Sequence, residues 1–164
     1  MSIYARKYKP SKWEPIVFAD KLDDMFTDFA ARDFGIKDLK TMLRHKYAVA
    51  PLDDDDFSFY FSILQEHKRR VRNHINLLTA NVRMANVYPS TISDLKERIT
   101  HQNQAVFACV LLSKEMKEIV RRFDVDLNKF AVYQETIDHE IMLIKRWKQR
   151  DNRLTKRILS KGGV

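Results

Sequence analysis

Hydrophobic residues recur every three or four positions along three long stretches of the chain. The first stretch follows an acidic run, Asp53 to Asp56, and ends before Pro89. Its series is Phe57, Phe61, Leu64, Lys68, Val71, Ile75, Leu78, Val82 and Ala85. Alternating steps of four and three place these side chains on one face of a helix that packs in a left-handed bundle. Aspartates favour a helix start, and a proline disfavours helical geometry at the residue before it. The pattern therefore predicts a helix from residue 54 to just before Pro89.

Two further stretches repeat this spacing. One follows Ser90 and Thr91, either of which can cap a helix, and Asp94 stands three residues after Thr91 as in a capping box. Its series is Ile92, Leu95, Ile99, Gln102, Val106, Cys109, Ser113, Met116, Val120 and Phe123. The other follows Asp124 and Asp126, and its series is Phe130, Tyr133, Ile137, Glu140, Ile144, Trp147, Asp151, Leu154 and Ile158. The turns between the stretches are short, so neighbouring helices must be antiparallel. We expect an all-α fold, an up-down-up bundle of three long helices, each about 45 Å long.

The first fifty residues have a different pattern. An apolar face of Phe18, Leu22, Met25, Phe26 and Phe29 indicates a short helix. Gly35 is expected to cap its C-terminus. Apolar residues in the next stretch indicate a second short helix; they are Ile36, Leu39, Leu43 and Tyr47. We expect both helices to pack on the long ones, supplying a fourth side. Residues 1–17 are then an N-terminal arm, and residues 18–164 form one helical domain, with short helices in 18–50 and long ones in 54–160.

Composition narrows the class of protein. The chain has 164 residues, of which 45% are hydrophobic, enough for a core without metals or disulfides. Its single cysteine, Cys109, cannot form an internal disulfide, so we expect a reducing, intracellular setting. The first residues lack the apolar stretch of a signal peptide, and no run of eighteen apolar residues predicts a membrane span.

Polar residues interrupt the apolar series. Lys68, Ser113 and Glu140 fall at about the same height of an up-down-up bundle, which predicts a buried polar layer of the kind that fixes helix register. The alternative is that Lys68 or Glu140 lies at the edge of its series and reaches water.

No motif indicates catalysis. Carboxylate-bridged di-metal bundles need Glu-x-x-His on two helices, whereas here Glu66 directly precedes His67 and His139 directly precedes Glu140. Glu135 and His139 share a helix face but lack further ligands. The chain has neither a P-loop nor a Gly-x-Gly fingerprint. We therefore expect a protein that is not an enzyme and takes no metal, cofactor or small-molecule substrate.

Basic residues gather near the end of the chain. The net charge is +8, and Arg146, Arg150, Arg153 and Arg157 follow one another at steps of four, three and four. On a helix they form one stripe with members about 5–6 Å apart, similar to the spacing of phosphates along a strand. Arginine holds phosphate in two-point contacts that lysine cannot reproduce. The patch is widened by Lys145, Lys148, Lys156 and Lys161.

Two more groups of basic residues are expected near this stripe. Antiparallel packing predicts that the same end of the bundle holds Arg72, Arg83, Lys96, Arg98 and His101, while Asp53 to Asp56, Asp124 and Asp126 lie at the other end. The N-terminal arm mixes basic and aromatic side chains, namely Tyr4, Arg6, Lys7, Tyr8, Lys9, Lys12 and Trp13. Such a segment can lie along a phosphate backbone and stack on exposed bases.

These features favour a non-enzymatic protein that binds DNA or RNA through phosphates, as an accessory component of a nucleoprotein assembly. Little sequence preference is expected, because no known base-reading motif is present. The alternative is a structural or adaptor protein, such as a phage or virion component. It would assemble with itself or with a larger complex. The contacts would come from the polar residues within the apolar series, an apolar surface around Phe26 and Phe29, and the oppositely charged ends. The stripe is also compatible with an ordinary solvated helix end or an acidic protein partner. A membrane surface fits least, since Asp151 interrupts the apolar face.

Overall fold

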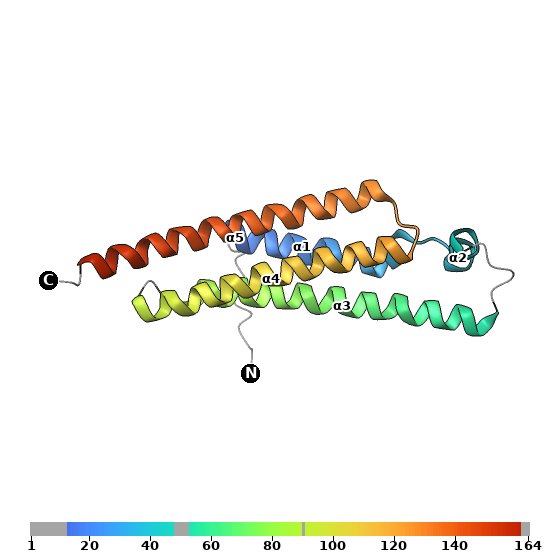
Figure 1. Cartoon of the computed structure of the whole chain (residues 1–164), viewed down its shortest axis with the longest axis horizontal. Coiled ribbons are helices and arrows are strands. Elements are labelled where there is room, and N and C mark those ends of the chain that lie inside the picture. Colours follow the sequence, from blue (N-terminus) through green and yellow to red (C-terminus); the bar gives the residue numbers. More distant parts are fainter. Residues whose placement is uncertain (1–12, 48–52, 90, 162–164) are drawn as a thin grey trace, which may run out of the picture.

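The computed structural model describes residues 13–47, 53–89 and 91–161, and within them the protein is all α-helical, as predicted (Figure 1). The helices are α1 (Glu14–Ala31), α2 (Leu39–Tyr47), α3 (Asp54–Val87), α4 (Ile92–Arg122) and α5 (Leu127–Lys161). A 3-10 turn, η1 (Asp33–Gly35), follows α1.

Four helices form the bundle. Helix α3 packs on α4, α4 packs on α5, and α1 packs on both α3 and α5, so each helix has two neighbours in a closed ring. Cross-helix contacts give the register: His67 meets Glu115, His101 meets Asn81, and Gln102 meets Asp151. In each pair of neighbouring helices, later residues of one meet earlier residues of the other. The predicted up-down-up order of the long helices is confirmed.

Local signals set the helix ends as predicted. The Asp53 side chain accepts a hydrogen bond from the backbone N–H of Asp56 at 2.7 Å. Thr91 caps α4 and also hydrogen-bonds the carboxylate of Asp94. Backbone geometry becomes extended at Tyr88, the residue before Pro89. These signals act within three residues of the cap, which is why they can be recognised without knowing the packing.

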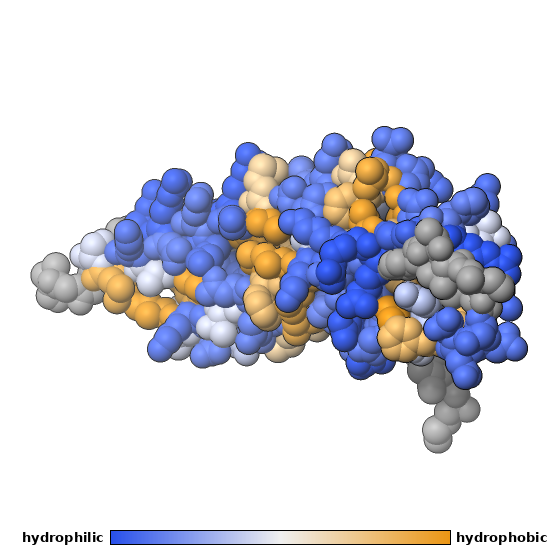
Figure 2. All heavy atoms as spheres, turned by 45° about the vertical axis from the view of Figure 1, so that its right-hand side comes forward, coloured by the Kyte–Doolittle hydropathy of each residue, from blue (hydrophilic) through white to orange (hydrophobic). Residues whose placement is uncertain are grey.

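The core follows the predicted series over most of α3. Leu64, Val71, Ile75, Leu78, Val82 and Ala85 are all buried. Phe61 is an exception, with 46% of its surface exposed. Because Glu115 meets His67, the last residue of α4, seven residues further on, lies opposite about residue 60 of α3. The first turns of α3 therefore extend beyond the bundle. Elsewhere, hydrophilic atoms cover most of the face shown in Figure 2, with hydrophobic atoms in patches between them.

The turn after α1 corrects the predicted role of Gly35. Helix α1 already ends at Ala31, and Asp33, Phe34 and Gly35 all have positive φ, of 51°, 57° and 82°. This turn places Phe34 in the core, where its ring lies 5.3 Å from that of Phe29. Gly35 therefore closes a separate turn and does not cap α1. Asp33 and Phe34 both carry a Cβ, so their left-handed backbone is unfavourable, and burial of the Phe34 ring offsets that cost.

The short helices pack differently from each other. Helix α1 begins at Glu14, so residues 14–17 of the predicted arm are helical, and Pro15 suits a first helical turn. Helix α1 supplies the fourth side of the bundle. Helix α2 lies beyond the end of it (Figure 1), where Leu43 is buried and Lys40 approaches the Phe57 ring at 4.8 Å. The expectation that both short helices form the fourth side is therefore wrong for α2.

Phe26 and Phe29 do not themselves form the expected exposed apolar surface, although Phe29 borders a hollow with Met25 and Val132. Both rings are buried, and the Phe29 ring stacks on Tyr133 of α5 with centroids 4.4 Å apart. Helix α5 covers the face that the sequence alone left open.

Candidate nucleic-acid interface

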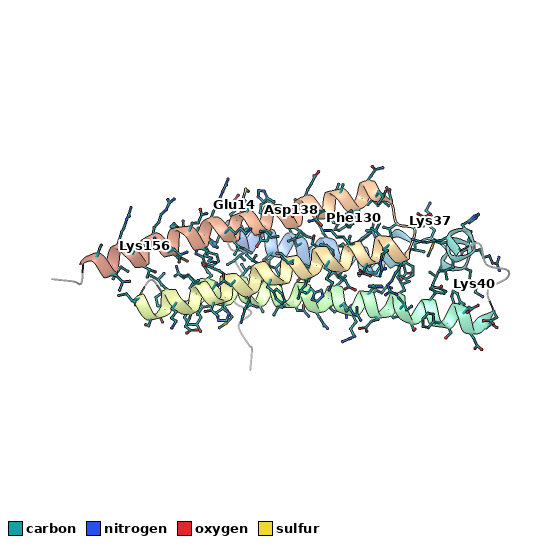
Figure 3. The ribbon with its side chains drawn as sticks, in the orientation of Figure 1. Glu14, Lys37, Lys40, Phe130, Asp138 and Lys156 are labelled. Atoms are coloured by element: carbon teal, nitrogen blue, oxygen red, sulfur yellow. The ribbon has the colours of Figure 1, made fainter. Side chains whose placement is uncertain are left out.

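The arginine stripe lies on the exposed side of α5. Arg146, Arg150, Arg153 and Arg157 are all exposed, as are Lys145 and Lys156; we call these six residues the α5 basic surface. Helix α5 runs past the turn between α3 and α4 (Figure 1), so the end of this surface projects from the bundle. Lys156 points away from the neighbouring helices (Figure 3). Lys148 is half-buried and donates a hydrogen bond to Asn103 at 2.7 Å.

The positive charge of this surface is not balanced by neighbouring carboxylates. Seven arginines elsewhere form ion pairs with aspartate or glutamate: Arg32, Arg69, Arg70, Arg83, Arg98, Arg121 and Arg122. Within the part of the chain that the structure describes, none of the six α5 basic-surface residues has such a partner. Their positive charge is therefore available to an external anion.

Most of the other predicted basic residues form contacts within the bundle. Arg83 forms an ion pair with Asp20 at 2.6 Å. The Arg98 guanidinium lies 3.2 Å from the Asp151 carboxylate, is only 13% exposed, and also donates to the carbonyl of Tyr88. His101 stacks on Tyr88 and contacts Asn81. These side chains hold the end of the bundle together, whereas Lys96 is exposed.

Arg72 is exposed at a different level. Asn81 is the α3 residue that meets the His101 and Gln102 region opposite Asp151. Arg72 precedes it by nine residues, about 13 Å along the helix. There it lines a hollow with Lys68 and Arg69 beside the C-terminal half of α1. Its predicted place next to the stripe is wrong, because height was counted from the turn and α5 extends past that turn.

Most of the predicted arm lies outside the described residues: Tyr4, Arg6, Lys7, Tyr8, Lys9 and Lys12, together with the side chain of Lys161. Trp13 is described and packs edge-on against Trp147, with ring centroids 5.6 Å apart and an interplanar angle of 76°. The Arg150 guanidinium lies over the Trp13 ring at 4.8 Å. The arm and the stripe thus meet at one residue pair within the structure.

This pair borders a hollow of about 240 Å³ that the sequence did not predict. We call it the tryptophan hollow; it is lined by Trp13, Glu14, Pro15, Leu143, Arg146, Trp147 and Arg150. Trp147 and Leu143 are buried and form its apolar part. The two tryptophans are far apart in sequence, so only the antiparallel packing of α1 on α5 brings them together.

The predicted buried polar layer does not form. Lys68 forms an ion pair with Asp33 in η1, and Ser113 donates to the side chain of Gln134. Glu140 is fully buried, and neither carboxyl oxygen has a hydrogen-bond partner in the described structure. Burial, with smaller effects of Asp20 and Glu14, raises the pKa of Glu140 to about 8. The side chain is therefore mainly neutral near pH 7.

Buried polar contacts occur elsewhere instead. Gln102 donates to the Asp151 carboxylate at 2.7 Å, so Asp151 joins α4 to α5 through both Gln102 and Arg98. His67 and Glu115 join α3 to α4, with Nδ1 and Oε1 2.5 Å apart. Gln102 and Asp151 both stand in the predicted apolar series, which was the available signal for their burial.

Within residues 13–47, 53–89 and 91–161, no three metal-ligating side chains cluster. No described helix combines the length and apolarity that crossing a bilayer requires. No protein family model matches the chain, and neither a curated protein nor a solved structure has significant similarity to it. Any function must therefore be argued from the residues themselves.

Proposed function

We propose that this chain is a non-enzymatic helical-bundle protein that holds DNA or RNA through phosphate contacts, as an accessory component of a nucleoprotein assembly. The α5 basic surface and the basic N-terminal arm supply the contacts. Because phosphate contacts position a protein without reading bases, binding has little sequence preference.

The main supporting observation is that the four α5 arginines have no described carboxylate partner, whereas seven of the nine described arginines elsewhere form an ion pair. Arg69 and Arg70 share the carboxylate of Glu66, at 2.7 and 2.9 Å, whereas the α5 basic surface has no described carboxylate partner. An ordinary solvated helix end needs only a few cations near the dipole. Four exposed arginines in register exceed that need, and their spacing suits consecutive phosphates.

The first test is fluorescence anisotropy with labelled single- and double-stranded DNA and RNA, repeated across salt concentration. Phosphate binding predicts a linear fall of log affinity with log salt, with a slope of about −0.9 per neutralised phosphate on duplex DNA. Arg153→Ala/Arg157→Ala is expected to reduce the magnitude of this slope by about 2 and to weaken binding to all sequences alike.

Arg69→Ala/Arg70→Ala is the matched control, because it removes the same charge from two exposed arginines that share the carboxylate of Glu66. We expect it to change the salt slope much less. Equal losses in the two variants would mean that net charge alone drives binding. Absence of binding at low salt would reject the proposal.

A second candidate function is head-to-tail assembly of copies of this chain. It is favoured by two aromatic side chains at the start of α3, Phe59 and Phe61, which are 60% and 46% exposed. They follow the exposed acidic run Asp53 to Asp56, at the end of the molecule opposite the α5 basic surface.

A further inference from the structure

The tryptophan hollow combines an apolar interior with a cationic rim. Trp147 is 5% exposed and Leu143 is 7% exposed, and with the half-buried Trp13 they give the interior its apolar and aromatic character. Arg146 and Arg150 line the same hollow and belong to the α5 basic surface. A ligand here meets aromatic rings and phosphate-binding groups within one site.

Its lining favours a base over a phosphate group. Desolvating a phosphate against Leu143 and the indole rings is unfavourable, and the carboxylate of Glu14 repels an anion. A planar base stacks on indole, and Glu14 can accept a hydrogen bond from its amino group. The volume of about 240 Å³ lies just below the range of whole small-molecule sites, and so suits one part of a larger ligand.

We propose that the tryptophan hollow holds one unpaired nucleobase of a single-stranded nucleic acid whose phosphates lie along the α5 basic surface. This inference rests on the proposed function and specifies its ligand. The Arg150 guanidinium already lies over one face of the Trp13 ring at 4.8 Å, and the base extends this stack, because indole and guanidinium planes both stack on nucleobases. Arg153 and Arg157, further along α5, contact the following phosphates.

The hollow gives the protein a preference for single strands. In a duplex each base is paired and stacked, and it must be extruded from the helix before it can enter a site of this kind. The extrusion cost falls only on the duplex, whereas phosphate contacts are available on both forms. The preference therefore depends on Trp13, and the electrostatic part of the affinity does not.

The test uses the intrinsic fluorescence of the full chain, since its only two tryptophans both line the hollow. Short single-stranded DNA and RNA oligonucleotides, duplexes of equal length and linear polyphosphate serve as probes. We expect single strands to change the tryptophan emission, and polyphosphate to bind without that change because it has no bases. Trp147→Phe leaves Trp13 as the only indole reporter.

Trp13→Ala is expected to lower single-strand affinity on the order of tenfold, the usual effect of removing one stacking partner. Polyphosphate affinity and helix content, followed by circular dichroism, are expected to stay the same. Trp13→Phe is the matched variant, since phenylalanine keeps an aromatic face, and it should restore most of the affinity.

The outcomes separate the two proposals. If neither oligonucleotides nor polyphosphate bind, the proposed function fails, and this inference fails with it. If both bind but Trp13→Ala lowers their affinities equally, or single strands bind no better than duplexes, the phosphate-binding function stands and the base site is rejected. Should Trp13→Ala lose helix content, Trp13→Phe decides by affinity: single-strand binding close to that of the wild type supports stacking, and binding no tighter than that of Trp13→Ala rejects it.

Discussion

At the scale of the residue, Glu140 is the clearest departure from the expected polar layer. The layer was expected to pair it with Lys68, but Lys68 reaches Asp33 in the turn after α1. Its carboxyl group therefore remains buried without a hydrogen-bond partner in the described structure. Acidic groups Asp20 and Glu14 on α1 disfavour its ionisation further, and so the folded protein holds it protonated near neutral pH.

This burial makes stability depend on pH. The Glu140 pKa rises from 4.5 in its ordinary state to about 8 in the folded protein. Between these values the unfolded chain loses the proton and the folded protein keeps it. The contribution of Glu140 to stability is therefore full below about pH 4.5 and declines as pH rises toward 8, by on the order of 1 kcal/mol per pH unit.

Glu140→Gln should remove this decline because its amide does not ionise. Urea denaturation at pH 5, 6, 7 and 8 measures the free energy of unfolding of both proteins, and the advantage of the variant is expected to grow with pH. Glu135→Gln, an exposed change on the same helix, is the control and should follow the wild type. A difference that stays constant across the range would show that Glu140 does not ionise in this window.

At the scale of the element, the sequence predicted what depends on neighbours within one helix. Caps at Asp53 and Thr91, the end before Pro89 and the apolar series all rest on local spacing. The errors concern height between helices. Arg72 and Glu140 were placed by counting from the turns, whereas α5 continues past the α3–α4 turn and η1 brings Asp33 to Lys68. Such offsets come from tertiary packing, which the spacing of apolar residues within one helix does not reveal.

The candidate site divides in the same way. Periodicity alone placed Arg146, Arg150, Arg153 and Arg157 on one exposed face, because a stripe belongs to a single helix. Periodicity could not place Trp13 beside Trp147, and it could not show that Arg98 forms an ion pair with Asp151. Both contacts join segments far apart in the chain.

Asp151 is expected to contribute strongly to the packing of α4 on α5. It is 3% exposed and accepts from both Arg98 and Gln102, so Asp151→Asn leaves the Arg98 guanidinium buried without an anion. Removing one partner of a buried ion pair typically costs about 3–5 kcal/mol, and we expect a loss of about 3 kcal/mol in urea denaturation at pH 7.

Asp138→Asn is the matched control for this change, because Asp138 is exposed on the same helix and bonds only locally to Gln134. A loss within about 0.5 kcal/mol is expected for it. Similar losses in the two variants would argue that the Arg98–Asp151 pair adds no net stability.

At the scale of the whole molecule, charge is distributed along the long axis. The exposed carboxylates of Asp53 to Asp56 lie at the start of α3, and the α5 basic surface lies toward the opposite end (Figure 1). Exposed Phe59 and Phe61 adjoin the acidic end. If these two different surfaces bind each other, the contact is heterologous and gives rings or filaments instead of closed dimers.

Mixing two variants tests this contact directly. Phe59→Ser damages only the acidic end, and Arg153→Ala/Arg157→Ala damages only the basic end. If copies join head to tail, the wild type forms a salt-sensitive series of oligomers in sedimentation velocity, and each variant alone stays monomeric. An equal mixture should form dimers only, because each variant retains one of the two surfaces. Phe107→Ser, which changes a 57% exposed ring on α4, is the control and should assemble like the wild type. A wild type that remains monomeric at low salt rejects self-assembly.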